Sequence, residues 1–122
     1  MTEAEILKKY GKDFGWYEHM ITHCETAMEG VEITKTLDAF AKNRLVFGGV
    51  VMSLLALGEL MKDLPDKYKF LDDNEVSKII GFRNRSAHGY NSLSPKIVRD
   101  TALINIPEIL QKLKRLQLSE KS

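Results

Sequence analysis

Four polar side chains of different chemistry lie within eight residues of this sequence: Arg83, Asn84, His88 and Tyr90. An arginine guanidinium is always charged and can hold a phosphate through two N–H donors, which stabilises charge that builds up in a transition state. An imidazole with a pKa near ~6.5 can remove a proton from a ribose 2′-hydroxyl or donate one to a leaving oxygen. This combination could support cleavage of RNA without a metal ion.

A helix is the element expected to carry this cluster, because Asp72 with Glu75 is typical of a helix start. A helix from there to about residue 90 would place the polar residues on a broad face beside apolar Ile80 and Ala87, at about 100° per residue. A cation and an imidazole beside an apolar stripe are expected at a cleft or a subunit interface. A single motif histidine, His88, cannot easily act as both base and acid. The hypothesis therefore predicts a homodimer whose two chains share the cleft.

A structural interpretation of the same residues stays open. Arg83 and Arg85 could pair with acids of a helical bundle, His88 could be a hydrogen-bonded helix residue, and Tyr90 could pack near the helix end. The residue types alone favour this second interpretation.

The charge of the chain is uneven along its length. The formal net charge is only +1, from 18 Lys+Arg and 17 Asp+Glu. Residues 1–75 carry a net charge of −5, residues 76–99 carry +5 with no acid, and residues 100–122 carry +1. A local positive block can attract phosphate even in a neutral protein, although a solvated helix face is the simpler explanation. The possible RNA phosphate contacts in this block, besides Arg83, are Lys78, Arg85, Lys96 and Arg99.

The length of 122 residues suits one domain, residues 1–122, and helical periodicity runs through almost all of it. The expected helices include a stretch from Trp16 to Val31, a largely apolar helix over about 37–64 that Pro65 ends, and a last helix that starts at Ser94–Pro95 and bends at Pro107. Short connections between such helices predict an all-α protein, an antiparallel bundle of four to five helices.

The composition favours a cytoplasmic protein without a bound metal or other cofactor. Cys24 is the only cysteine, so no disulfide can form within the chain. The uncharged stretch over 45–58 has 14 residues, fewer than the ~17–25 of a membrane span, and is interpreted as a buried helix. His19 and His23 are one helical turn apart, but no second pair of ligands supports a zinc site.

The stretch IIGFRNRSAHGY, residues 79–90, resembles the signature of the HepT-like toxins, which lie within the wider HEPN group of helical proteins. The pattern of that family is Arg-Asn, three variable residues, His, one variable residue and Tyr. Arg83, Asn84, His88 and Tyr90 match it position by position. The resemblance extends over about residues 16–118.

The resemblance implies a homodimeric helical bundle that acts as the metal-independent endoribonuclease toxin of a toxin–antitoxin pair. Arg83 and His88 would be catalytic, and Asn84 a supporting polar residue. It also implies a minimal nucleotidyltransferase antitoxin of the MntA type, which would transfer AMP from ATP to Tyr90. The alternative is a non-catalytic helical partner, or substrate-binding subunit, of such a nucleotidyltransferase.

Overall fold

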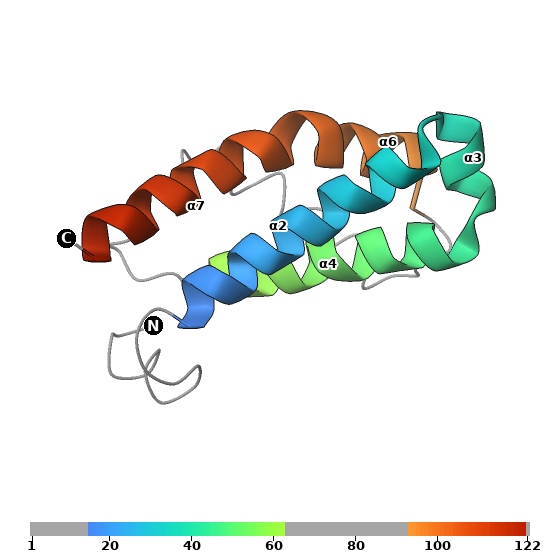
Figure 1. Cartoon of the computed structure of the whole chain (residues 1–122). Helices are drawn as coiled ribbons and strands as arrows, with labels where there is room; N and C mark the ends of the chain where they lie inside the picture. Colours follow the sequence, from blue (N-terminus) through green and yellow to red (C-terminus); the bar gives the residue numbers. More distant parts are fainter. Residues whose placement is uncertain (1–14, 63–92, 122) are drawn as a thin grey trace.

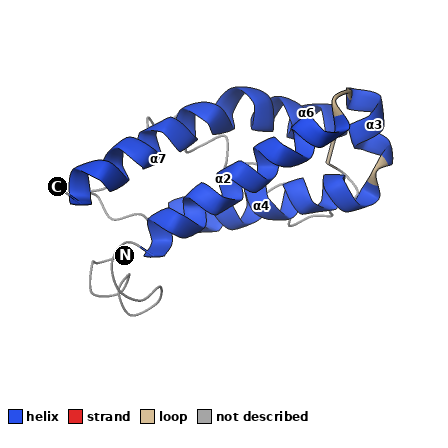
Figure 2. Ribbon diagram, viewed as in Figure 1, coloured by secondary structure: helices blue, strands red, loops and turns tan. Residues whose placement is uncertain are grey.

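The computed structural model describes residues 15–62 and 93–121 of the chain. Every regular element within these two ranges is a helix, and Figure 2 shows no strand there. The three long helices are α2 (Gly15–Thr34), α4 (Arg44–Lys62) and α7 (Ile106–Lys121). In Figure 1, α2 runs opposite in direction to both α4 and α7, and it packs against both of them. The predicted all-α class is therefore confirmed.

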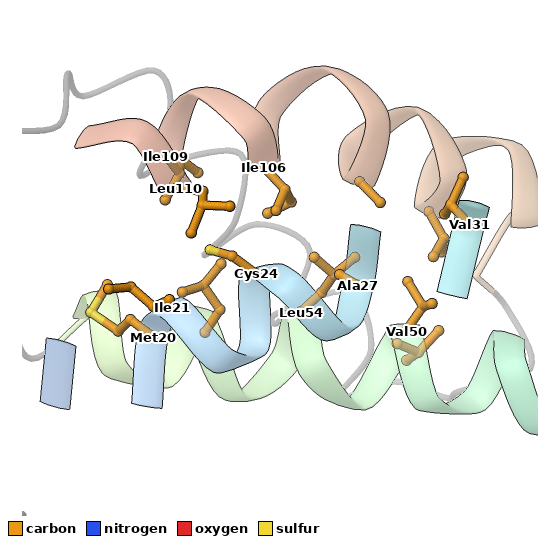
Figure 3. Close-up of a cluster of buried hydrophobic side chains, with 14 of the residues drawn as sticks. Met20, Ile21, Cys24, Ala27, Val31, Val50, Leu54, Ile106, Ile109 and Leu110 are labelled. Carbon is orange, nitrogen blue, oxygen red and sulfur yellow. The ribbon is translucent and has the colours of Figure 1, made fainter. Parts of the chain in front are cut away.

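The buried face of α2 follows helical spacing. Met20, Cys24, Ala27 and Val31 lie four, three and four residues apart, and each is at most 2% exposed. Figure 3 shows these side chains within a cluster that takes Val50 and Leu54 from α4 and Ile106, Ile109 and Leu110 from α7. The core therefore lies between this one face of α2 and the helices α4 and α7, and α2 packs against both of them.

Close contact between α2 and α4 depends on Gly30. A Cβ added at Gly30 would lie 2.5 Å from Cγ2 of Val50 and 3.3 Å from Cγ1 of Val46. Glycine is needed here because of space. A larger residue would force the Val50 side chain to shift or the two helices to move apart.

A single helix over 37–64 was predicted, and this prediction is wrong at Asn43. The chain forms α3 (Leu37–Lys42), leaves helical geometry at Asn43 with φ −90° and ψ 93°, and starts α4 at the next residue. The Asn43 Oδ1 accepts a hydrogen bond from the backbone N–H of Val46 at 3.1 Å. Asparagine is among the strongest helix N-caps, so one residue both ends α3 and begins α4. The predicted stop at Pro65 lies outside the described residues.

α4 also corrects the prediction about membrane length. Arg44–Met61 is 18 residues long and, by length and composition only, is apolar enough to cross a membrane. The 14-residue count was too strict because it stopped at the first charge on each side. The core helix of a soluble protein passes the same test, and 39% of this window is buried inside the protein.

The last helix is continuous but changes its hydrogen bonding. It consists of α6 (Pro95–Asp100), a π-helical turn η3 (Thr101–Asn105) and α7. The backbone N–H of Ile106 bonds to the carbonyl of Thr101, five residues earlier. Pro107 follows at once, has no N–H, and would clash with the carbonyl four residues before it in a regular α-helix. The wider turn relieves this conflict directly before the proline.

Candidate functional site

The predicted catalytic cluster lies outside the described residues. Arg83, Asn84, His88 and Tyr90, and the possible phosphate contacts Lys78 and Arg85, all fall within 63–92. The helix predicted over 72–90 falls in the same range. Their assignments therefore stay predictions. The structure shows the described elements on either side of this range, which are the end of α4 and the start of α6.

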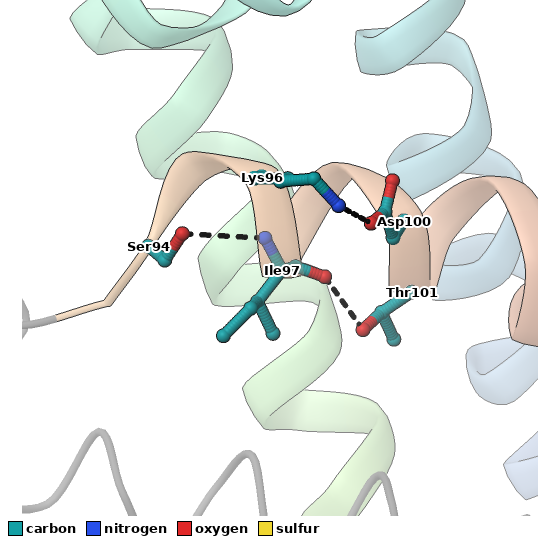
Figure 4. Close-up of polar contacts among 5 residues, drawn as sticks. All are labelled: Ser94, Lys96, Ile97, Asp100 and Thr101. Atoms are coloured by element: carbon teal, nitrogen blue, oxygen red, sulfur yellow. Dashed lines mark hydrogen bonds and ion pairs between the residues drawn. The ribbon is translucent and has the colours of Figure 1, made fainter.

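The start of α6 agrees with the cap predicted at Ser94–Pro95. The Ser94 Oγ accepts a hydrogen bond from the backbone N–H of Ile97 at 3.5 Å (Figure 4). Pro95 occupies the first turn of the helix. The carbonyl of Ser94 accepts from the N–H of Val98 at 3.0 Å. Leu93, just before the cap, is buried. The first described residues after the motif are therefore held in place, Leu93 by burial and Ser94 by its hydrogen bonds to the start of α6.

Lys96, a predicted phosphate contact, lies on the surface of α6. Its Nζ is 2.8 Å from Oδ2 of Asp100 (Figure 4). The side chains of the pair are 70% and 42% exposed. An exposed ion pair of this kind is worth at most about 1 kcal/mol. A phosphate could therefore replace Asp100 as the partner of Lys96 at small cost.

Arg99, the second predicted phosphate contact that the structure describes, is held by the fold itself. Its Nη2 donates a hydrogen bond to the backbone carbonyl of Lys35 at 3.1 Å, which joins α6 to the end of α2. Lys35 has φ 63°, the left-handed conformation in which many helices end. The Arg99 Nε is buried and finds no hydrogen-bond partner among the described residues. Sequence reasoning missed this structural role, because the two residues are 64 positions apart.

A shallow pocket of about 280 Å³ surrounds this junction. It combines Glu32, Lys35 and Arg99 with an apolar lining from Met28, Val31, Ala102, Leu103 and Pro107. The charges are mixed, since Glu32 lies beside the two cations. The pocket therefore has no strong preference for an anion, and Arg99 within it is foremost a structural residue.

The histidine and cysteine pattern of α2 forms no metal centre in the part of the chain that is described. No group of three His, Cys, Asp or Glu residues there is placed to hold a metal ion. Burial lowers the pKa of His23 from 6.5, and the nearby positive charge of His19 lowers it further. Burial, with a smaller contribution from Glu25, raises the pKa of Cys24 to about 12. A thiol so protonated is a core side chain and not a nucleophile.

The fold defines the class of this protein, an all-α bundle in which a capped helix follows directly after an Arg-x4-His stretch of the sequence. Comparison with known proteins then gives the family. The profile of the family described as Ribonuclease HepT-like matches residues 20–116. The chain belongs to this ribonuclease family, which confirms the resemblance and the class of enzyme predicted from the sequence.

A relative of similar size agrees with this family. The chain is 30% identical over 107 residues to the protein named "Putative RNase TTE0752" from Caldanaerobacter subterraneus subsp. tengcongensis, and the match covers 87% of this chain and 95% of that protein. No solved structure matches the chain significantly.

Proposed function

We propose that this protein is a metal-independent endoribonuclease and the cytoplasmic toxin of a toxin–antitoxin pair, with its active site in a cleft shared by two copies of the chain. The observation that carries the proposal is the ribonuclease family match over residues 20–116. That range contains Arg83, Asn84, His88 and Tyr90 at the spacing of the family motif.

The chemistry follows from the residue types. The imidazole of His88 takes the proton of a ribose 2′-hydroxyl, and the oxygen attacks the adjacent phosphorus. The bond to the 5′-oxygen breaks, and His88 of the partner subunit gives that oxygen a proton. Arg83 stabilises the charge that builds on the phosphate oxygens, and Asn84 supports the site as a polar neighbour. The products carry a 2′,3′-cyclic phosphate and a 5′-hydroxyl.

Of the two predicted phosphate contacts that the structure describes, Lys96 is better suited than Arg99 to bind RNA. The ammonium group of Lys96 is exposed and can exchange Asp100 for a phosphate. The guanidinium of Arg99 is already bonded to the Lys35 carbonyl, so its loss would loosen the junction of α2 with α6. Lys78 and Arg85 complete the proposed basic surface.

The deciding test is cleavage of end-labelled RNA in EDTA by protein made without any partner. Wild type should cut, and His88→Ala should lower the rate by roughly 10² to 10⁴-fold, the usual contribution of general acid–base catalysis. His19→Ala removes an exposed imidazole from α2 and serves as the matched control, with a rate close to that of wild type.

Two results would contradict the proposal in different ways. Undiminished cleavage by His88→Ala would mean that the catalytic assignment is wrong. No cleavage by wild type, with an intact mass that shows unmodified protein, would favour the alternative of a binding subunit for a nucleotidyltransferase.

Regulation is tested separately, at Tyr90. In the proposed reaction the Tyr90 oxygen attacks the α-phosphorus of ATP, pyrophosphate leaves, and AMP stays on the tyrosine. A phosphate beside Arg83 would then occupy the cation that the RNA needs. Incubation with a minimal nucleotidyltransferase and ATP should raise the intact mass by whole AMP units. Tyr90→Phe should abolish this increase, and a mass increase that persists in that variant would place the modification elsewhere.

A further inference from the structure

The solvent-facing side of α4 carries an apolar stripe, most of which the described helices leave exposed. Leu45 is 89% exposed, Met52 is 61% exposed, Gly49 is exposed and Ala56 is half-buried. These four residues lie four, three and four positions apart, so they share one side of the helix at about 100° per residue. We call them the outer stripe. A spacing of alternating three and four residues is the pattern by which two helices pack along a common seam.

A hollow lies beside the middle of the outer stripe. It measures about 190 Å³ and lies between α2 and α4, with Ile33, Val46, Gly49 and Val50 among its lining residues. A Cβ added at Gly49 would meet no atom within 4 Å. Ile33 at its edge is 63% exposed. The glycine thus leaves space for an apolar side chain from outside the chain.

We propose that a second copy of the chain packs its own α4 antiparallel across the outer stripe, with Met52 of each subunit inserted in the hollow beside Gly49 of the other. The proposal rests on the proposed function, because a shared cleft requires two copies. It adds the surface through which they meet.

The sizes of the stripe residues support this register. When Met52 faces Gly49 of the partner subunit, antiparallel pairing also places Leu45 opposite Ala56 of the partner subunit. Each large side chain then meets a small residue at all four contacts. One patch supplies both the inserting side chain and the space for it, as a two-fold symmetric interface requires. Methionine is flexible and polarizable, which suits it to fill an irregular hollow.

The charges at the two ends of α4 favour the same orientation. Arg44 is exposed at the first residue of the helix, and Glu59 is exposed near its end. Antiparallel packing brings Arg44 of one subunit toward Glu59 of the other. Parallel packing would place like charges side by side, which costs free energy at a contact.

The first experiment measures the mass of the full-length protein in solution by sedimentation equilibrium over a range of concentrations. Wild type should be a dimer. Gly49→Leu puts a side chain into the hollow, where a Cβ meets no atom within 4 Å, and Met52→Lys places a charge in it. Each should weaken the dimer by at least about tenfold, the effect of losing one well-packed contact. Gln111→Leu, an exposed position on α7, is the matched control and should dimerise like wild type.

The second experiment tests the register by chemical crosslinking of introduced cysteines. Gly49→Cys mixed with Met52→Cys should crosslink, because these positions face each other. Leu45→Cys should not crosslink to itself, because the two copies would be ~17 Å apart, eleven residues along the helix. Cys24 is buried in the core and should contribute little background.

Several results would overturn this interface. They are a wild-type protein that stays monomeric, a dimer that Gly49→Leu and Met52→Lys leave intact, or a Leu45→Cys protein that crosslinks to itself. A monomer that cosediments with phosphatidylcholine vesicles, and loses this property in Met52→Lys, would assign the stripe to a membrane instead.

RNA cleavage by the same variants separates the two proposals. If Gly49→Leu is monomeric and inactive, both the interface and the shared cleft are supported. If it is monomeric and still cuts RNA, the interface stands and the shared cleft is wrong. If it is dimeric and active, the ribonuclease stands and the interface is wrong.

Discussion

The two sides of α4 use the same kinds of residue for opposite purposes. On the inner side Leu54 is fully buried, and the backbone of α2 comes close enough at Gly30 that a methyl group would overlap Val50. On the outer side Met52 is 61% exposed and Gly49 has empty space in front of it. The inner side is completed by the chain itself. The outer side is the surface that we propose a second copy covers, and the residue types of the two sides alone do not reveal this difference.

The largest expected difference between the two sides of α4 is in how much truncation of a side chain lowers the free energy of unfolding. Leu54→Ala should lower the free energy of unfolding by about 2–5 kcal/mol, because it removes buried contacts and leaves a cavity. Met52→Ala should change it by less than about 0.5 kcal/mol in the monomer, since this side chain is mostly in water. Urea denaturation at low protein concentration measures both values.

The concentration dependence of these values sharpens the comparison. Raising the protein concentration should stabilise wild type and Leu54→Ala alike, and should stabilise Met52→Ala less, because dimer formation adds to apparent stability by mass action. A large loss in monomeric Met52→Ala would mean that the outer side belongs to the core of the chain.

The two glycines give the next largest contrast. Gly30→Ala should destabilise the protein by about 1–3 kcal/mol, because Val50 or the helix backbone must move to admit the methyl group. Gly49→Ala should stabilise the monomer by up to about 1 kcal/mol, because alanine is the better helix former and has space at this position. Thermal unfolding followed by circular dichroism, at a protein concentration low enough to keep the chain monomeric, reports both changes. A loss of stability in Gly49→Ala would show that this glycine is needed inside the chain.

The sequence predicted the described fold well where the periodicity was long. The buried spacing of Met20, Cys24, Ala27 and Val31 and the cap at Ser94 could both be predicted, because each depends on local pattern or chemistry. The break at Asn43 was missed because apolar periodicity continues across it, and a cap residue inside such a run gives only a weak local signal. The π turn next to Pro107 could be expected only as an irregularity.

The site, unlike the fold, was predicted from the spacing of a few polar residues. The spacing of Arg83, Asn84, His88 and Tyr90 indicated the family, and the family match agrees with it. The hydrogen-bond partners of the basic residues Lys96 and Arg99 could not be predicted equally well. Lys96 bonds to Asp100 one turn away, which helix geometry allows, whereas Arg99 bonds to a carbonyl 64 residues distant. That contact depends on how α2 and α6 are packed, which no local pattern contains.

The smallest expected effect concerns pH, at the edge of the buried face of α2. The pKa of half-buried His23 lies below 6.5 in the folded chain, because burial and then the charge of His19 disfavour the imidazolium. Below about pH 6.5 the unfolded chain therefore binds more protons at this residue than the folded chain does. Its neutral form stabilises the fold fully above that pH, and this contribution is lost as the pH falls toward the lowered pKa. Urea denaturation between pH 7.5 and pH 5 should show a shallower loss of stability in His23→Gln than in wild type. His19→Gln should remove only the smaller, electrostatic part of the pKa shift of His23. If the free energy of unfolding changes equally with pH in all three proteins, His23 is as well solvated as a surface residue.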